Sequence, residues 1–311
     1  MTLTLTHRYN RAIAVGYGDQ LLFSYVYVPD MPQSESPKPY FHPIHTLGGN
    51  EISCYRPYDH LWHKGLQMTM AHLSTPTVRA QNFWGGGSYV HGHGYVQLPN
   101  NGSMDHQHWR AVELTDDAVT LHHTLAWLTE AGDRWLDEER RIVVNNVDAR
   151  AGTYCLDFHT ALTNVWTEEL HFGSPTTAGR PNAGYGGLFW RGPRSFTPSG
   201  TIRTAGGLHS ATTPEAEIMG SASNWLAYSG RHDGSGHRST LLFLDHPANP
   251  RYPNKWFVRR DPFACVSFAF SFDEELPLPV GETLTLRYRI VIGDGEVGEE
   301  VIADHVARWQ E

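Results

Sequence analysis

The densest group of titratable side chains lies within the nine consecutive residues from Arg56 to Lys64. It places the carboxylate of Asp59 and the imidazoles of His60 and His63 between two cations. An imidazole titrates near neutral pH, and a carboxylate beside one ring nitrogen fixes which nitrogen carries the proton. We therefore predict that His60 or His63, oriented by Asp59, acts as a general acid or base. Arg56 and Lys64 are predicted to bind substrate oxygens. The simpler interpretation is a polar turn whose groups satisfy one another.

A second histidine-rich segment, His91-Gly-His93, follows three consecutive glycines. In an extended segment His91 and His93 would point the same way, and imidazole nitrogens are common ligands of divalent metals. A divalent metal held by His60 and His63, together with His91 or His93, is therefore left open as a cofactor. A surface loop without a ligand is the alternative interpretation.

Aromatic, basic and amide side chains in three further segments suit the binding of a small carbohydrate. Sugars present apolar C–H faces ringed by hydroxyls, which match flat aromatic rings with polar groups beside them. The segment from Leu244 to Trp256 is stiffened by prolines, and stiffening orients polar groups in advance. The predicted substrate-binding side chains are Arg56, Lys64, Trp84, Tyr185, Arg191, His246, Asn249 and Arg251.

The amino-acid composition indicates which kind of molecule the protein binds. The chain of 311 residues contains 10 Trp and 19 His, and its formal net charge is −9. Charges of both signs are scattered without a Lys/Arg block, so binding to nucleic acid is not expected. The partner that we expect is a small carbohydrate, and assembly into a homo-oligomer is left open.

The elements that must position these residues are mostly strands. Apolar and polar residues alternate, as in Val119-Thr-Leu-His-His-Thr-Leu, which is typical of a sheet with one buried face. Only Glu296–Trp309 has helical spacing. The predicted strands are Thr2–Thr6, Gln20–Val28, Leu66–His72, Ala118–Leu128, Arg140–Asn145, Cys155–Thr163, Trp225–Ser229, Thr240–Leu244, Cys265–Phe272 and Thr283–Ile292. We therefore predict an all-β fold, a large two-sheet antiparallel β-sandwich with a C-terminal helix, forming a single domain over residues 1–311.

Two other segments are expected to lie at the surface. Trp135–Arg141 carries three carboxylates, and a charged edge strand is its simplest interpretation because charge blunts exposed sheet edges. The proline-rich segment Asp30–Pro43 is expected to be a surface loop.

The sequence predicts a cytoplasmic protein. No segment approaches the ~18 consecutive apolar residues of a membrane span, and the N-terminus lacks the pattern of a signal peptide. The three cysteines, Cys54, Cys155 and Cys265, are far apart and without a C-x-x-C pair, which favours a reducing compartment.

Several motifs, spread over nearly the whole chain, resemble a known family. They are Arg56-Pro-x-Asp59-His60-x-x-His63-Lys64-Gly65, Asn82-Phe-Trp-Gly-Gly, Tyr185-Gly-Gly-Leu and Leu244-Asp245-His246-Pro-x-Asn249-Pro-Arg251. They resemble the PmoA-type family ("methane oxygenase PmoA"), whose members occur in bacterial sugar catabolism. The resemblance implies a fold similar to the galactose-mutarotase supersandwich. The chain departs from mutarotases in that the strand beginning at Ala264 has no carboxylate before Asp273, where mutarotases carry a catalytic Glu.

Three functions follow as hypotheses. The first is a carbohydrate-active enzyme, of isomerase, lyase or glycosidase type, that acts on a sugar or oxidised sugar by His/Asp acid–base chemistry. The second is a sugar-binding protein without catalysis. The third is a metal-dependent oxygenase, for which Asp59 and two histidines would supply the two-His, one-carboxylate ligand set.

Overall fold

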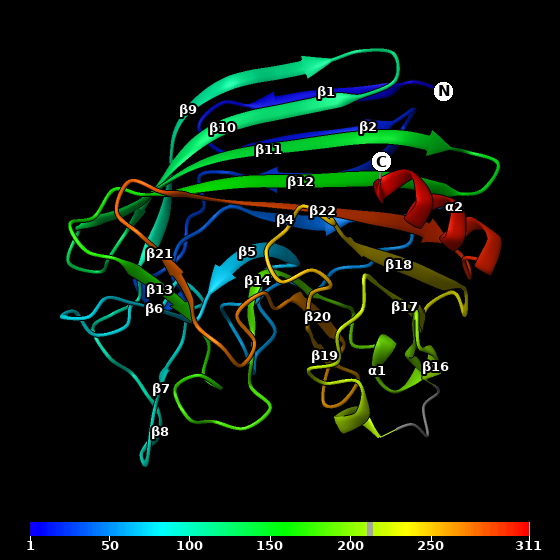
Figure 1. Cartoon of the computed structure of the whole chain (residues 1–311). Helices are drawn as coiled ribbons and strands as arrows, with labels where there is room; N and C mark the ends of the chain where they lie inside the picture. The colour runs from blue at the N-terminus through cyan, green and yellow to red at the C-terminus, as the bar shows by residue number, and fades with distance from the viewer. Residues whose placement is uncertain (210–213, 311) are drawn as a thin grey trace.

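The computed structural model describes residues 1–209 and 214–310, and two large antiparallel sheets dominate it (Figure 1). The eight-stranded sheet has the order β1 (Leu3–Arg8), β2 (Ala12–Tyr17), β3 (Gln20–Val26), β4 (Tyr40–Ile44), β5 (Leu66–Met70), β14 (Gly186–Arg191), β20 (Cys265–Phe268) and β19 (Trp256–Arg259). The nine-stranded sheet has the order β16 (Gly207–His209), β15 (Thr201–Thr204), β17 (Trp225–Arg231), β18 (Arg238–Asp245), β22 (Thr283–Asp294), β12 (Thr153–Asn164), β11 (Arg134–Asp148), β10 (Val119–Leu128) and β9 (Ser103–Leu114).

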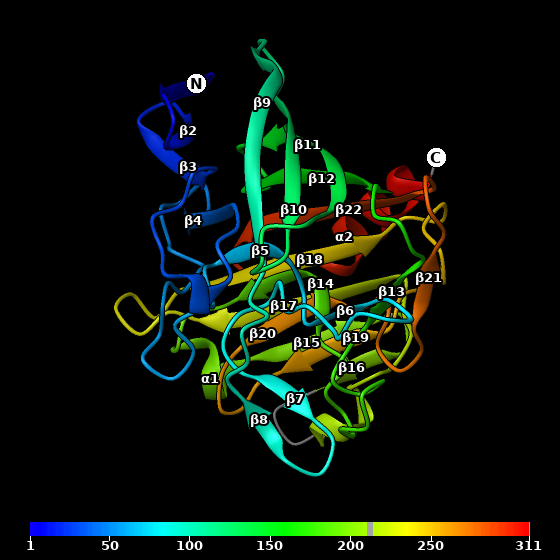
Figure 2. The ribbon, with the colours of Figure 1, turned by 90° about the vertical axis from the view of Figure 1, so that its left-hand side faces the viewer.

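Smaller elements complete the chain. A three-stranded sheet contains β21 (Leu276–Leu278), β13 (Leu170–Gly173) and β6 (His72–Ser74), and the strands β7 (Ser88–Val90) and β8 (Gly94–Val96) form a hairpin. The hairpin projects below the sheets (Figure 2). The helical segments are η1 (Gln33–Glu35), α1 (Phe196–Ser199), η2 (Glu215–Glu217) and α2 (Glu299–Gln310).

The main core lies between the two large sheets. Alternate residues along each strand point to opposite faces of a sheet. In β14, Leu188 and Trp190 therefore pack in the core, together with residues of the nine-stranded sheet such as Leu121 and Leu156. Phe189 lies between Leu188 and Trp190 and points to the other face, where it joins a second, separate apolar cluster. That second cluster forms the floor of the candidate site.

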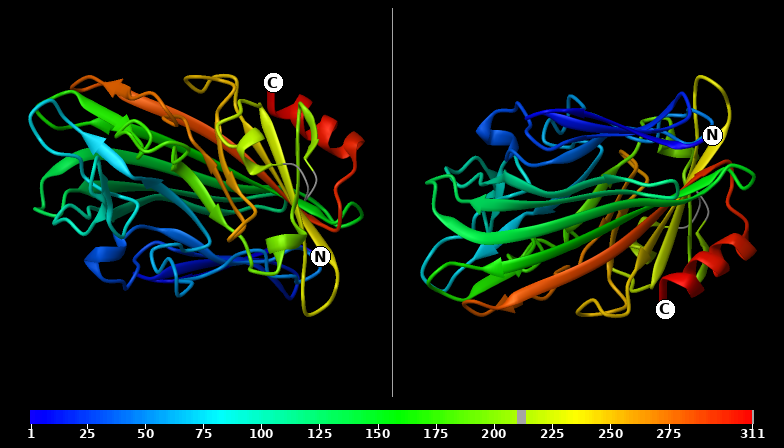
Figure 3. Two further views of the ribbon diagram at one scale, coloured as in Figure 1. Left: turned by 90° about the horizontal axis from the view of Figure 1, so that it is seen from below. Right: turned by 90° about the horizontal axis from the view of Figure 1, so that it is seen from above.

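Helix α2 covers the outer face of the nine-stranded sheet. Ile302 and Trp309 pack there against Leu242 and Val291. Both views in Figure 3 place α2 on the opposite side of the molecule from the N-terminal strands. The helix begins three residues later than predicted, after the two glycines at 295 and 298, which favour loop conformations. The predicted two-sheet antiparallel sandwich with a C-terminal helix is confirmed.

Two surface predictions are wrong. Strand β11 is not an edge strand, since it pairs with β10 and β12. The side chains of Glu138 and Arg140 point into the core and form a wholly buried ion pair. The proline-rich segment at Asp30–Pro43 likewise contains a buried carboxylate, Glu35. In each case a charged side chain is buried because an oppositely charged partner lies beside it.

The single domain expected for the whole chain stays a prediction, although one buried cluster draws side chains from both large sheets. In the described residues, none of the helices has the length and apolar character needed to cross a membrane.

Candidate active site

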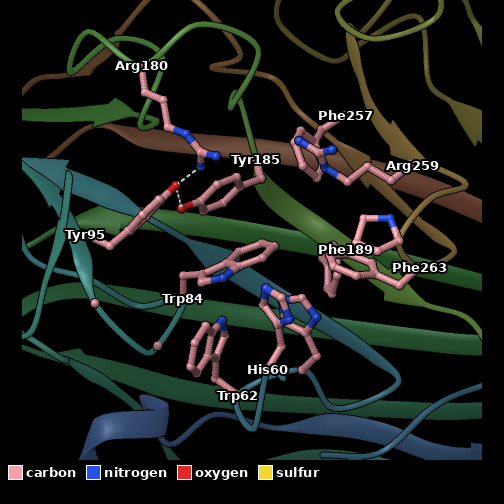
Figure 4. Close-up of a pocket in the computed structure, with 14 residues that line it drawn as sticks. His60, Trp62, Trp84, Tyr95, Arg180, Tyr185, Phe189, Phe257, Arg259 and Phe263 are labelled. Carbon is pink, nitrogen blue, oxygen red and sulfur yellow. Dashed lines mark hydrogen bonds between the residues drawn. The ribbon is translucent and has the colours of Figure 1, made fainter. Parts of the chain in front are cut away.

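A cavity of about 380 Å³ lies on the face of the eight-stranded sheet that points away from the main core (Figure 4). Phe189 of β14 and Phe257 of β19 form its floor, because their neighbours Trp190 and Trp256 are turned into the core. Loops before β5, β7, β14 and β20 supply the walls, together with Tyr95 of β8. The cavity is lined by His60, Trp62, His63, Trp84, Gly85, Gly87, Tyr95, Arg180, Tyr185, Phe189, Phe257, Arg259, Pro262 and Phe263.

The loop that carries His60 and His63 is closed by its own backbone. Arg56 N–H donates to the carbonyl of His63 at 2.9 Å, and His63 N–H donates to the carbonyl of His60 at 3.0 Å. The loop ends at Gly65, which has φ +61°, and a Cβ there would lie 2.2 Å from the Phe41 carbonyl oxygen. Glycine is therefore required at position 65. The four-residue turn from His60 to His63 brings their rings together.

Asp59 lies against His60. Its Oδ2 is 3.2 Å from His60 Nδ1, an electrostatic contact without the alignment of a hydrogen bond. Burial raises the pKa of Asp59, but a backbone hydrogen bond and the Arg191 charge outweigh it and hold the pKa below its usual value. Arg194 also donates to Asp59 Oδ1 at 2.7 Å. The resulting carboxylate only accepts hydrogen bonds, so it favours a proton on His60 Nδ1 and leaves Nε2 as the basic nitrogen.

The neighbour of His63 is a cation and not a carboxylate, because Arg191 Nη1 lies 2.9 Å from His63 Nδ1. A guanidinium only donates, so His63 Nδ1 must be the acceptor, and the neutral ring then carries its proton on Nε2. Arg191 is completely buried and is fixed by the Phe263 ring, 3.8 Å from the guanidinium carbon. Among the described residues, His63 Nε2 has no hydrogen-bond partner, and His63 lines the cavity.

The two imidazoles stack with their ring centroids 4.6 Å apart and an interplanar angle of 22°. Burial lowers the pKa of His60, although Asp59 opposes the shift. Burial lowers the pKa of His63 far more, and the nearby His60 and Arg191 add to it. Both rings are therefore neutral at neutral pH. His60 then has a basic Nε2 and His63 a buried Nε2–H, a combination that can act as general base and general acid.

The Trp84 wall is shaped by one asparagine. Asn82 Oδ1 accepts the backbone N–H groups of Trp84 and Gly85, each at 2.9 Å. A Cβ on Gly85 or Gly86 would lie 2.6 Å from atoms of Trp62. These two glycines thus let the loop pack tightly against the histidine loop.

The wall beside Trp84 joins three segments that are far apart in the sequence. Tyr185 precedes β14, and its hydroxyl is 2.8 Å from that of Tyr95 on β8. Arg180 donates to the Tyr95 hydroxyl and lies over the Tyr95 ring (Figure 4). Arg259 at the end of β19 lies over the Phe257 ring, 5.4 Å from its centroid. The cavity therefore has imidazoles at one end and guanidinium groups at the other.

Arg56 and Lys64, predicted to bind substrate, instead hold a buried carboxylate. Arg56 Nε donates to Glu35 Oε2 at 3.0 Å, and Lys64 Nζ binds the same oxygen. Lys64 and Glu35 are almost fully buried. Burial lowers the pKa of Lys64 to about 8, although Glu35 opposes the shift. Arg56 and Lys64 stand at the two ends of the histidine loop, and both bind Glu35. They thus anchor the loop and neutralise the buried charge of Glu35.

The polar segment after β18 also builds structure rather than the cavity. Asn249 Nδ2 donates to Asp245 Oδ1 at 2.7 Å, and its Oδ1 accepts the Arg287 N–H. Arg251 donates to the backbone carbonyl of Glu275 at 2.7 Å. His246 lies edge-on against Trp309 of α2. The prediction that His246, Asn249 and Arg251 join the site is therefore not supported by their positions.

The metal site left open above, with His60 and His63 joined by His91 or His93, is not assembled. His91 and His93 are exposed in the turn between β7 and β8, where Gly92 has φ +77°, so the extended geometry assumed for them is wrong. His60 and His63 stack on each other instead of converging with them. Within residues 1–209 and 214–310, no group of three or more His, Cys, Asp or Glu side chains is placed to hold a metal ion.

Of the predicted site residues, the structure brings Asp59, His60, His63, Trp84, Tyr185 and Arg191 together. Sequence reasoning missed Arg180, Arg259, Tyr95, Phe257 and Phe263. Tyr95 could have been found, because it follows the glycine-rich histidine segment. Phe257 and Arg259 alternate with core residues in a strand that was not predicted, and Arg180 lies in a loop without a motif.

The fold and the cavity define a two-sheet β-sandwich with an aromatic pocket on one face. The chain belongs to a family of unknown function, DUF6807, whose pattern matches residues 12–307. This match does not support the PmoA-type name suggested by the motifs. Comparison with the curated proteins gave no match.

Three solved structures show the range of similar chains. Galactose 1-epimerase from Lactobacillus acidophilus NCFM is 7% identical, with a TM-score of 0.42 over 94% of this chain and 98% of that chain. GH36 alpha-galactosidase AgaA from Geobacillus stearothermophilus is 11% identical, with a TM-score of 0.40 over 94% of this chain and 41% of that chain. Heparan sulfate lyase HepC from Pedobacter heparinus is 7% identical, with a TM-score of 0.38 over 92% and 34%. The chain thus spans about two fifths or less of the latter two proteins, and no residue role is transferred from any of them.

Proposed function

We propose that this protein is a carbohydrate-active enzyme that moves a proton on a sugar or oxidised sugar, in an isomerase or lyase type of reaction. The observation that carries the proposal is the stacked pair His60 and His63, whose polar partners give them opposite hydrogen-bonding roles at one cavity. His60 Nε2 takes a proton from carbon or oxygen. His63 Nε2–H donates to the oxygen on which negative charge develops, as a neutral imidazole can.

The aromatic walls support a sugar as the substrate. Trp84 and Tyr185 lie with their ring centroids 4.4 Å apart, and Phe189 and Phe257 extend the apolar surface between the polar ends. Such a surface matches the C–H face of a pyranose or furanose ring, while the imidazoles and guanidinium groups match its oxygens. The cavity volume is within the range of small-molecule sites.

A glycosidase mechanism is less well supported. Most glycosidases use two carboxylates that flank the bond to be broken. In the described part of the chain, no Asp or Glu lines the cavity, and Asp59 lies behind His60 against two arginines. The oxygenase hypothesis is not carried forward, because Asp59, His60 and His63 lie together but, within the described residues, no three His, Cys, Asp or Glu side chains are placed to hold a metal ion.

The test is exchange of carbon-bound hydrogen in D₂O, followed by proton NMR over a panel of aldoses, ketoses, aldonates and uronates. We expect at least one sugar to lose a C–H signal or give a new product. His60→Gln and His63→Gln are each expected to slow this reaction by roughly 100-fold to 10,000-fold, the usual contribution of a general acid or base.

The matched control is His93→Gln, which changes an exposed histidine at the β7–β8 turn. It should leave the rate unchanged. If the panel shows binding without exchange or product for any sugar, the protein is a sugar-binding protein and the enzyme proposal fails.

A further inference from the structure

The end of the cavity opposite the histidines carries two arginines from unrelated parts of the chain. Arg180 lies in the loop after β13, and Arg259 ends β19. Both guanidinium groups lie near the hydroxyl of Tyr185, a half-buried side chain. Figure 4 shows the two side chains on either side of Tyr185, with His60 and Trp62 at the other end of the cavity.

Each guanidinium has an aromatic ring on one face. The Arg180 carbon is 4.8 Å from the centroid of Tyr95, and the Arg259 carbon is 5.4 Å from that of Phe257. A stacked guanidinium keeps its N–H groups at its edges, in the plane that matches a carboxylate. Arg180 uses Nη1 for Tyr95, and Arg259 uses Nη1 for Glu215 at 3.2 Å. Each guanidinium has five N–H donors, so donors remain for a ligand.

The charge of the cavity is positive. Both histidines are neutral at neutral pH, and among the described lining residues the charged side chains are these two arginines. Arg191 adds a completely buried cation below the histidines. Arg259 is paired with Glu215 at 3.2 Å, and Arg191 lies 3.7 Å from Asp59, whereas no carboxylate of the described residues pairs with Arg180. An anionic sugar would add a charge–charge attraction at Arg180, in a partly desolvated site, that a neutral sugar lacks.

We propose that the substrate is a carboxylated sugar, an aldonate or uronate, whose carboxylate is held by Arg180 and Arg259. This inference rests on the proposed function, because it places the carbon skeleton between the arginines and the imidazole pair. The guanidinium fork matches both a carboxylate and a phosphate, so the experiment includes a sugar phosphate to distinguish the two anions.

The experiment measures binding of the full chain by calorimetry to D-glucuronate, D-galacturonate, D-gluconate and D-galactonate. Each uronate is compared with its methyl ester and with the parent neutral sugar, and glucose 6-phosphate represents the phosphates. We expect at least one acid to bind roughly tenfold to 100-fold more tightly than its uncharged counterpart, as charge-assisted hydrogen bonds allow. Arg180→Ala and Arg259→Ala should each remove most of that preference.

Arg110→Ala is the matched control, since Arg110 is an exposed arginine on β9 of the other sheet. It should keep the preference. Arg180→Lys and Arg259→Lys retain the charge without the fork and are expected to fall between wild type and alanine. Circular dichroism of each variant identifies any loss of fold, and the lysine variants keep the test valid if an alanine variant unfolds.

Equal binding of acids and neutral sugars, tighter binding of the phosphate, or no binding of any acid would each overturn the carboxylate assignment. The outcome is separable from that of the proposed function. Acids that bind through the arginines but undergo no reaction would leave this inference standing and remove the enzyme. Turnover of neutral sugars that depends on His60, without tighter binding of the acids, would support the enzyme and overturn this inference.

Discussion

Two of the histidine pairs in the described part of the chain differ in what their ring nitrogens contact. His60 and His63 stack at the cavity with centroids 4.6 Å apart. His106 and His123 lie between the sheets with centroids 5.1 Å apart, and their Nδ1 atoms are 2.9 Å from each other. Burial is the largest cause of the lowered pKa in all four residues.

In the interior pair, His106 Nδ1 and both nitrogens of His123 contact protein groups. His123 Nε2 is 2.8 Å from the hydroxyl of Tyr25, which accepts from Arg140, so His123 has both nitrogens occupied. At the cavity, the carboxylate of Asp59 faces His60 Nδ1 and the guanidinium of Arg191 faces His63 Nδ1, and the protein supplies no hydrogen-bond partner for Nε2 of His63 among the described residues. A lowered histidine pKa therefore does not by itself identify a catalytic site. The position of the ring at a cavity and the charge of its neighbours distinguish the two pairs.

The largest expected effect is a loss of folding stability on substitution in the interior region. Arg140→Met removes one partner of the wholly buried pair with Glu138. We expect a loss of about 3–5 kcal/mol in the free energy of unfolding, since an unpaired charge stays in the core. Urea denaturation measures it. Arg141→Met is the control, because Arg141 is the exposed neighbour on the same strand, and it should change stability little. An equal effect of both would contradict the role of the buried pair.

The second effect is on the cavity pair. Asp59→Asn removes the carboxylate that raises the pKa of His60 and favours the proton on Nδ1. The rate should fall by roughly tenfold or more, less than on loss of His60 itself. The acid limb of the kcat/KM profile should move to lower pH, because the His60 pKa falls further without its carboxylate. A rate loss without movement of the limb would show that Asp59 only supports the loop.

The contrast also shows how much the sequence could reveal. The regular alternation of apolar and polar residues predicted long strands such as β10 and β22. The high density of titratable side chains between Arg56 and Lys64 pointed to Asp59, His60 and His63. The role of Lys64 was misjudged because its partner, Glu35, lies 29 residues earlier in a segment expected at the surface. Arg180 and Arg259 were missed because only tertiary packing brings their loops together.

The smallest effect concerns acid stability. Burial lowers the pKa of His106 to about 4, against 6.5 in the unfolded chain. Between pH 6.5 and about 4 the unfolded chain therefore binds a proton that the folded protein does not, and stability falls as the pH falls through this window. His106→Gln removes this contribution, so its urea midpoint should drop less between pH 7 and pH 4.5 than that of wild type. His93→Gln should behave as wild type. An unchanged drop in His106→Gln would contradict the assignment.

The most direct test of the opposite roles of His60 and His63 needs no substrate. Long-range proton–nitrogen correlation spectra at pH 7.5 report which nitrogen of each ring carries the proton, and spectra of His60→Gln and His63→Gln assign the signals. We expect His60 to be protonated on Nδ1 and His63 on Nε2, because a carboxylate faces one ring and a guanidinium the other. The same tautomer in both rings, or a doubly protonated ring at this pH, would contradict the proposed acid–base pair.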